Sequence, residues 1–171
     1  MIRLLLIVLP LLASAGCGYK VSGQGDLLPS TIKTIAIPAW GNNTARYKLA
    51  ERLPVALTRE FLTRTRYKVV ADPNQADAIL TGSVGNIFAY PILVNQSTGL
   101  PAGIQMIVML QMKLAERQTG KVLYERQAFE ARQRYEISVD PVAYFEESTT
   151  AIDRLAREVS RSIVSSVLES F

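Results

Sequence analysis

The sequence contains no histidine, and this absence excludes much of the chemistry that an enzyme could perform. Imidazole is the side chain that most often serves as a general base near neutral pH, and it is a common ligand of transition metals. Without it, neither a Ser-His-Asp triad nor a Cys-His pair can form. The glycines also lack the spacing, and the following Lys-Ser/Thr, of a phosphate-binding loop. We therefore expect a protein without catalytic residues, metal or cofactor.

Cysteine is equally scarce, because Cys17 is the only one. It follows Arg3, an apolar run over residues 4–13 and three small residues, which is the pattern of a secretory signal peptide. The apolar run is shorter than the roughly 20 residues needed to span a bilayer. A cysteine directly after small residues is typical of the bacterial lipobox, which predicts lipid attachment to Cys17. The alternative is an ordinary signal peptide with an unmodified cysteine.

Several expectations follow from lipidation of Cys17. No disulfide can then form, so the fold depends on its apolar core. More than one acyl chain makes anchoring stable. The next residue is Gly18 rather than aspartate, which in Gram-negative lipoproteins is typical of an outer-membrane address facing the periplasm. The predicted divisions are a signal peptide over 1–16, a lipidated tether over 17–31 and a single domain over 32–171.

Composition and periodicity predict the fold of that domain. Apolar residues make up 49% of the chain and charged residues 20%, which is typical of a globular protein, and the formal charge of +4 is too small to indicate nucleic-acid binding. Leu49, Leu53, Leu57 and Phe61 recur every fourth residue and predict a helix over 45–63. Strand-like runs predict strands over 32–38, 67–70, 78–93, 104–114 and 122–134. An uncharged loop is predicted over 94–103, and a final helix is predicted from Asp140-Pro141 onward. The order predicts an α+β fold, a two-layer sandwich of two helices on a four- to five-stranded mixed sheet.

Two surfaces are candidates for function. Ile107 and Met109 lie at the centre of the second face of strand 104–114, where a partner could bind; the alternative is that a helix covers each face of the sheet. Arginine is frequent on the helix over 45–63 and on the last strand, and its fork of donors suits lipid phosphates. The alternative for the arginines is a solvated charged surface. The candidates on the last strand are Arg126, Arg132 and Arg134.

Taken in order, several segments resemble the LptE family of lipopolysaccharide-assembly lipoproteins. The segments are CGYKV at the predicted mature start, LPSTIKTIAIP, ADAILTGSV, IQMIVMLQMKL, TGKVLYE and the long final helix. The resemblance covers nearly the whole of the chain after the signal peptide.

The resemblance implies a non-enzymatic partner of LptD, a large outer-membrane β-barrel. Members of the family plug that barrel, assist its assembly and contact lipopolysaccharide through basic residues near the strands. It therefore implies that the sheet face of Ile107 and Met109 meets the barrel. No local motif identifies which basic residues match the family's, and our hypothesis is that Arg126, Arg132 and Arg134 contact lipopolysaccharide. The alternative function is a periplasmic lipoprotein that activates a cell-wall synthase or serves in a secretion pore.

Overall fold

The computed structural model describes residues 28–45, 48–136 and 141–171. The predicted signal peptide, Cys17, most of the tether and Asp140 lie outside the described residues. The described chain forms six strands, one 3₁₀ turn and two long helices. Their bounds are β1 (Thr34–Ala36), β2 (Gly41–Asn42), α2 (Lys48–Arg64), β3 (Lys68–Val70), η1 (Pro73–Gln75), β4 (Ala78–Val94), β5 (Pro101–Glu116), β6 (Val122–Glu136) and α3 (Pro141–Leu168).

The six strands form one mixed sheet in the order β3-β1-β4-β5-β6, with β2 beside β4. β1, α2 and β3 make a βαβ unit, because β1 and β3 pair in parallel. β1 and β2 are parallel to β4, whereas β4, β5 and β6 form an antiparallel meander. The predicted α+β fold and its element order are confirmed. The sheet exceeds the predicted strand number because of the two-residue strand β2.

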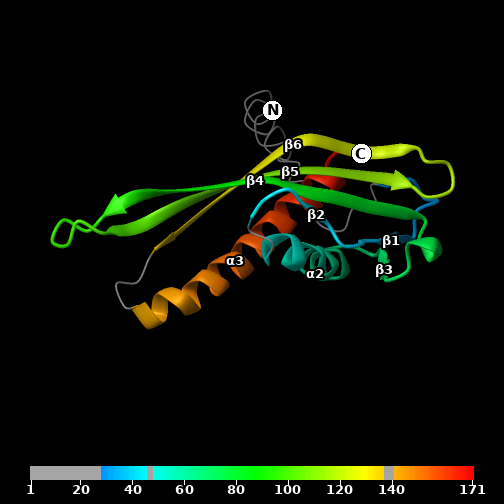
Figure 1. Cartoon of the computed structure of the whole chain (residues 1–171). Coiled ribbons are helices and arrows are strands. Elements are labelled where there is room, and N and C mark those ends of the chain that lie inside the picture. Colours follow the sequence, from blue (N-terminus) through cyan, green and yellow to red (C-terminus); the bar gives the residue numbers. More distant parts are fainter. Residues whose placement is uncertain (1–27, 46–47, 137–140) are drawn as a thin grey trace, which may run out of the picture.

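Both helices lie on the same side of the sheet and pack side by side, as Figure 1 shows. The core is the layer between them and the sheet. Its largest fully buried side chains include Leu53, Leu57 and Phe61 of α2 and Leu155 and Ile163 of α3. The apolar stripe predicted for α2 is therefore confirmed as a buried face. The alternative arrangement, in which one helix covers each face, is wrong for the described part of the chain.

Alternation along β5 assigns its side chains to the two faces of the sheet. Met106, Val108, Leu110, Met112 and Leu114 are buried against the helices, as their period of two predicts. Ile107 and Met109 point to the opposite face, where neighbouring side chains cover them only in part. We call the face turned away from α2 and α3 the outer face.

The start of β4 is fixed to β1 through Asp77. Its Oδ2 accepts hydrogen bonds of 2.9 Å from the backbone N–H of Lys33, the backbone N–H of Thr34 and the Thr34 hydroxyl. The Lys33 N–H has the largest effect, and together these donors lower the pKa of the Asp77 carboxyl below its ordinary value. These three hydrogen bonds hold the parallel strands β1 and β4 in register.

The hairpin of β4 and β5 is longer than the sequence predicts. The expected loop over 94–103 is wrong in extent, because Val94 pairs with Pro101 and Leu93 pairs with Gly103. The loop is confined to residues 95–100, where Asn95 Oδ1 accepts the Ser97 N–H at 2.9 Å and Gly99 has φ of 70°. Proline and glycine are frequent in loops, but proline is compatible with the first residue of a strand.

Candidate functional site

The outer face is uncovered by any helix in the described part of the chain, and three cross-strand rows define it beside the hairpin. Residues directly opposite each other on antiparallel strands lie on one face, so the pairing register identifies the members of each row. The rows are Asn86–Met109–Glu130, Phe88–Ile107–Arg132 and Tyr90–Gln105–Arg134. Each row runs from β4 to β6, with polar or charged side chains at its β6 end.

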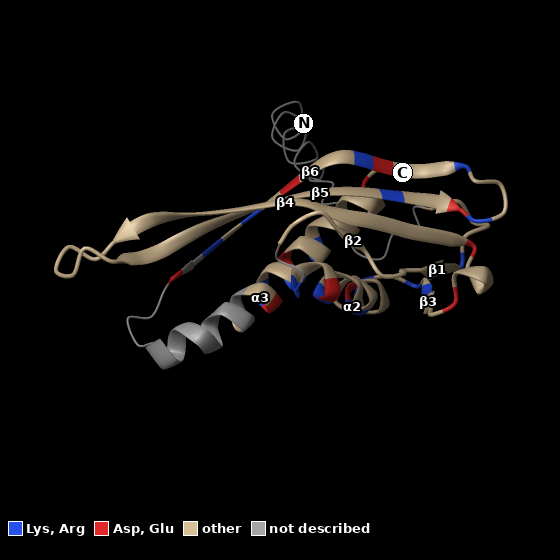
Figure 2. Ribbon diagram, in the orientation of Figure 1, with Lys and Arg blue, Asp and Glu red and all other residues tan. Residues whose placement is uncertain are grey.

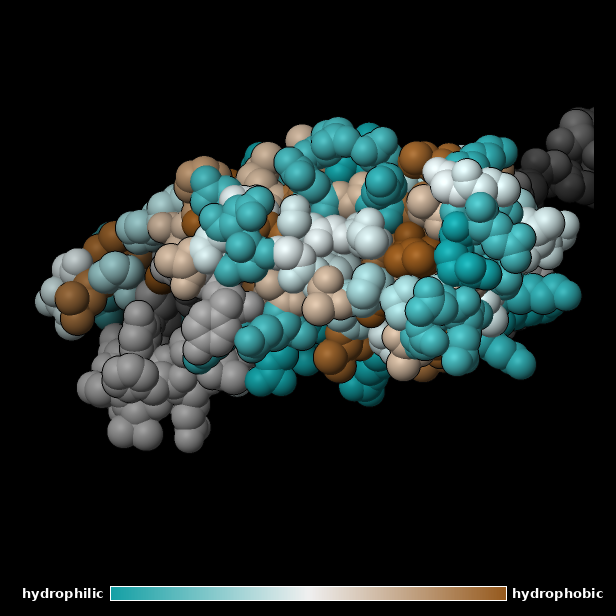
Figure 3. All heavy atoms as spheres, turned by 45° about the vertical axis from the view of Figure 1, so that its right-hand side comes forward, coloured by the Kyte–Doolittle hydropathy of each residue, from teal (hydrophilic) through white to brown (hydrophobic). Residues whose placement is uncertain are grey.

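Apolar side chains are exposed along the hairpin from these rows to its tip. Phe88, Tyr90, Leu93, Val94 and Leu100 keep between 44% and 58% of their surface accessible. The hairpin extends past α2 in Figure 1, and hydrophobic residues gather at this end of the molecule in Figure 3. An exposed apolar patch of this kind is typical of an interaction surface.

The hairpin also carries no charge. Residues 78–112 contain no Asp, Glu, Lys or Arg, and Figure 2 shows β4 and the facing part of β5 without charged residues. Sequence reasoning identified Ile107 and Met109 but missed Phe88 and Tyr90, which the register places on the same face. The long uncharged stretch is the signal in the sequence that extends the candidate surface beyond β5.

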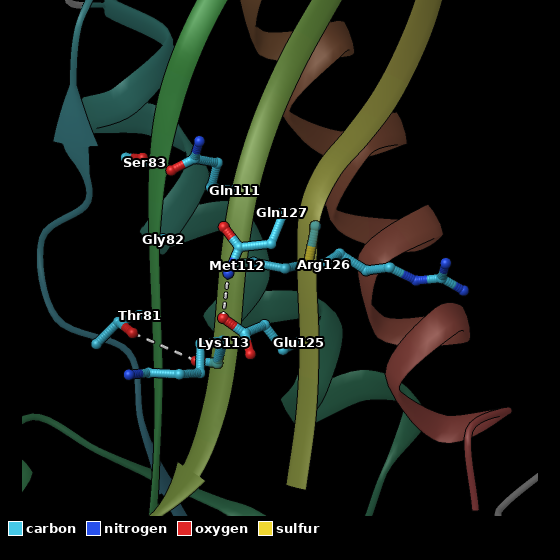
Figure 4. Close-up of a pocket in the computed structure, with 9 residues that line it drawn as sticks. All are labelled: Thr81, Gly82, Ser83, Gln111, Met112, Lys113, Glu125, Arg126 and Gln127. Carbon is cyan, nitrogen blue, oxygen red and sulfur yellow. Dashed lines mark hydrogen bonds between the residues drawn. The ribbon is translucent and has the colours of Figure 1, made fainter. Parts of the chain in front are cut away.

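The three candidate arginines of β6 do not lie together. Arg132 and Arg134 are opposite Ile107 and Gln105, on the outer face. Arg126 is opposite the buried Met112, so it lies on the face of the helices, and Figure 4 shows it extending on the side of α3. The cause is an irregularity between Leu110 and Met112, where β6 has one residue more than β5 and its alternation changes sides.

Arg132 is further distinguished by an ion pair along its own strand. Its Nε donates a hydrogen bond to Glu130 Oε1, two residues away and on the same face. This hydrogen bond raises the pKa of the Arg132 guanidinium above its ordinary value. Arg134 is exposed, and it is in none of the ion pairs between described residues. Along β6 the outer face therefore carries the paired Arg132, then Arg134, and then Glu136 at the last position of the strand.

A shallow depression of about 240 Å³ lies farther along the outer face, on the polar part of β4, β5 and β6. Thr81, Lys113 and Glu125 form one cross-strand row there, as Figure 4 shows. The Thr81 hydroxyl donates to the Lys113 carbonyl at 3.3 Å, and the Gln127 amide donates to Glu125. These groups can hydrogen-bond water or a hydroxylated ligand, but they include no nucleophile paired with a base.

A family model described as lipopolysaccharide-assembly matches residues 32–167, which include every described strand and nearly all of α3. The chain belongs to the LptE family. No individual curated protein sequence matches it. The matched range is the domain built on the sheet and the two helices, so the LptE assignment and the fold describe the same part of the chain.

Solved structures resemble this LptE-family chain in fold. Rare lipoprotein B from Shewanella oneidensis has 13% identity and a TM-score of 0.50, covering 80% of this chain and 95% of that chain. Lipoprotein B from Nitrosomonas europaea has 18% identity and a TM-score of 0.50, covering 89% and 96%. A protein from Chlamydia trachomatis has 8% identity and a TM-score of 0.54, covering 81% and 97%. At these identities the likeness shows the fold alone.

Two further findings concern the described residues of this LptE-family chain. They contain no group of three or more metal-ligating side chains. None of the described helices has the length and apolarity needed to cross a bilayer. Cys17, the predicted lipidation site, lies outside the described residues. Within the described chain, the exposed apolar side chains make the outer face and the hairpin the candidate functional site.

Proposed function

We propose that this protein is a non-enzymatic outer-membrane lipoprotein that plugs an LptD-type β-barrel, assists its assembly and takes part in delivering lipopolysaccharide to the outer leaflet. The observation that carries the proposal is the uncharged hairpin with its exposed apolar side chains on an uncovered sheet face. Burying these side chains against a barrel wall removes apolar surface from water without burying an unpaired charge. Membership of the LptE family supports the choice of partner.

Retention of the barrel tests this function directly. The tagged full-length protein is purified from detergent-solubilised outer membrane, and the retained partner is identified by mass. We expect a large β-barrel in a one-to-one amount. Met109→Asp places a charge at the centre of the outer face and should reduce the retained barrel by about tenfold, since a desolvated unpaired charge is costly. Recovery of a cell-wall synthase, or of a ring of identical subunits, would replace the proposal with the alternative.

Gln111→Asp is the matched control for Met109→Asp. Gln111 lies two residues farther along β5, is exposed, and borders the polar depression rather than the apolar rows. The same added charge there should leave the retained barrel within about twofold of wild type, because the carboxylate stays hydrated. Equal losses in the two variants would show an effect of charge alone and would contradict the assignment of the apolar rows to the barrel.

Contact with lipopolysaccharide is assigned to the arginines at the β6 end of the rows. Charge reversal in Arg132→Glu/Arg134→Glu should weaken capture of lipopolysaccharide by the immobilised protein, because guanidinium groups bind phosphate through paired hydrogen bonds. Arg126→Glu makes the same kind of change on the helix face and should leave capture intact. Unchanged capture by the double variant would reject the two outer-face arginines.

The lipid anchor on Cys17 completes the proposed function and is tested by intact mass. The protein from membranes should begin at Cys17 and carry the additional mass of several acyl chains. Cys17→Ala should abolish that mass and release the protein from the membrane fraction, since acyl chains supply the anchoring energy. An unmodified cysteine in a cleaved, membrane-free protein would favour the ordinary signal peptide.

A further inference from the structure

A groove of about 390 Å³ lies between the two helices. From α2 it is lined by Ala56, Arg59, Glu60 and Thr63, which occupy one flank of the helix at spacings of three and four. From α3 it is lined by Arg157 and Arg161, four residues apart on the facing flank. Figure 2 shows charged residues on both helices where they run side by side.

The ion pairs around the groove leave two of its arginines uncompensated. Glu60 pairs with Arg64 at 3.3 Å, and Glu158 pairs with Arg161 at 3.0 Å. Arg64 also donates to the Ser165 hydroxyl at 3.0 Å, so it ties α2 to α3. Arg59 and Arg157 make no ion pair with any described residue, although both line the groove and both are exposed. Four arginines against two glutamates leave an excess of two positive charges.

We propose that this groove binds a phosphate monoester, with Arg59 and Arg157 as the two binding residues. A phosphate monoester carries about −1.5 to −2 charges at neutral pH, which matches the two uncompensated guanidinium groups. Each guanidinium presents a planar fork of donors that fits two phosphate oxygens. The groove is on the opposite side of the sheet from the outer face, so this site is separate from the surface assigned to the barrel and to Arg132 and Arg134.

The packing of the two helices fixes the backbone positions from which the two arginines project. Arg59 is one turn before Thr63, whose hydroxyl donates back to the Arg59 carbonyl at 2.9 Å. Arg157 is one turn before Arg161, which also lines the groove and pairs with Glu158. Tight packing of α2 on α3 through Leu57 and Phe61 fixes the separation of the two flanks. A phosphate bound here would serve as the shared anionic partner of Arg59 and Arg157, which have no carboxylate partner among the described residues.

Isothermal titration of the full-length protein in neutral detergent tests the site. The ligands are dioctanoyl phosphatidic acid, inorganic phosphate and, as the neutral comparison, dioctanoyl phosphatidylcholine. We expect phosphatidic acid to bind and phosphatidylcholine not to bind. Arg59→Gln/Arg157→Gln should weaken phosphatidic acid binding by about tenfold or more, because two charge-assisted contacts are lost. Equal binding of inorganic phosphate identifies a small anion as sufficient, and binding of the lipid alone identifies a headgroup; both support a phosphate site.

Lys48→Gln/Arg154→Gln is the matched control. It removes the same charge from the same two helices at exposed positions that do not line the groove. It should change the affinity by less than about twofold, because neither side chain lines the groove and salt screens charges at the exposed surface. Equal weakening by both double variants, binding of phosphatidylcholine like phosphatidic acid, or no binding of either phosphate ligand would overturn the proposal. Thermal unfolding of each variant verifies that the helices remain packed.

Discussion

The carboxylate of Asp77 has a structural role that its sequence position does not suggest. It accepts three hydrogen bonds from Lys33 and Thr34 and thereby joins the start of β4 to β1. Asp77→Asn should lower the free energy of unfolding by about 1 kcal/mol at neutral pH, because charge-assisted hydrogen bonds become neutral ones. Asp72→Asn is the control, since an asparagine can still accept the Asn74 N–H that Asp72 accepts at 2.9 Å. Urea denaturation measures both, and equal losses would contradict this role.

The same carboxyl makes stability depend on pH in a defined direction. Its pKa is lower in the folded chain than in the unfolded chain, where an aspartate has a pKa of about 3.9. Its contribution is therefore complete above that unfolded value and is lost as the pH falls through the folded pKa. Asp77→Asn should flatten the decline of stability below about pH 4, and an unchanged acid profile in the variant would contradict this assignment.

Gly82 is required because the Trp40 ring occupies the space above it. A Cβ at this position would lie 2.7 Å from Trp40 Cζ3, and the ring is buried. Gly82→Ala should destabilise the fold by about 1–3 kcal/mol, since the ring must move within a packed core. Gly85→Ala, whose Cβ meets only the Met109 carbonyl oxygen at 3.5 Å, should be nearly neutral. Thermal unfolding compares the two, and a neutral Gly82→Ala would show that the ring moves freely.

At the scale of elements, the end of the β4–β5 hairpin can be shortened without removing residues of the core. Residues 91–104 are mostly exposed, and Tyr90 and Gln105 are directly opposite at their base. Replacing residues 91–104 by Asn-Gly should change the free energy of unfolding by about 1 kcal/mol or less, because a shorter loop closes easily. Retention of the barrel should be lost. Replacement of residues 96–98 by Gly-Ser-Gly keeps the length and should retain it; barrel binding by the shortened chain would exclude the hairpin tip from the interface.

Periodicity in the sequence predicts the helices and strands of this fold better than it predicts where strands end, which face a side chain occupies and how the helices pack. The apolar stripe of α2 and the alternation of apolar residues along β5 are clear signals in the sequence, because each element buries one face. Both predictions are confirmed. The end of the hairpin was not predictable from composition, since pairing across the strands extends β5 to Pro101 through residues typical of loops. The face of Arg126 depends on one irregularity in β6, which no glycine or proline marks. The groove at Arg59 and Arg157 depends on how two helices pack, which the sequence of either helix leaves undetermined.

Taken whole, the molecule has two proposed binding surfaces on opposite sides of one sheet. Its outer face carries the uncharged hairpin and the rows that end in Arg132 and Arg134, and its other side carries α2, α3 and the arginine groove. The core between them is continuous and contains the fully buried side chains of both helices and of β5. Because Met109, Arg59 and Arg157 are not part of this core, the two surfaces should be separable by mutation.

Variants of the two surfaces should have opposite effects on barrel binding and on phosphate binding. Met109→Asp should reduce retention of the barrel by about tenfold and leave phosphatidic acid affinity within about twofold, because its charge is on the far side of the sheet from the groove. Arg59→Gln/Arg157→Gln should do the reverse. Both quantities are measured on each purified full-length variant, with thermal unfolding as the check on the core. A loss of both activities in either variant would mean that the sheet couples its two faces, whereas independent losses identify a barrel-binding side and a phosphate-binding side of one lipoprotein domain.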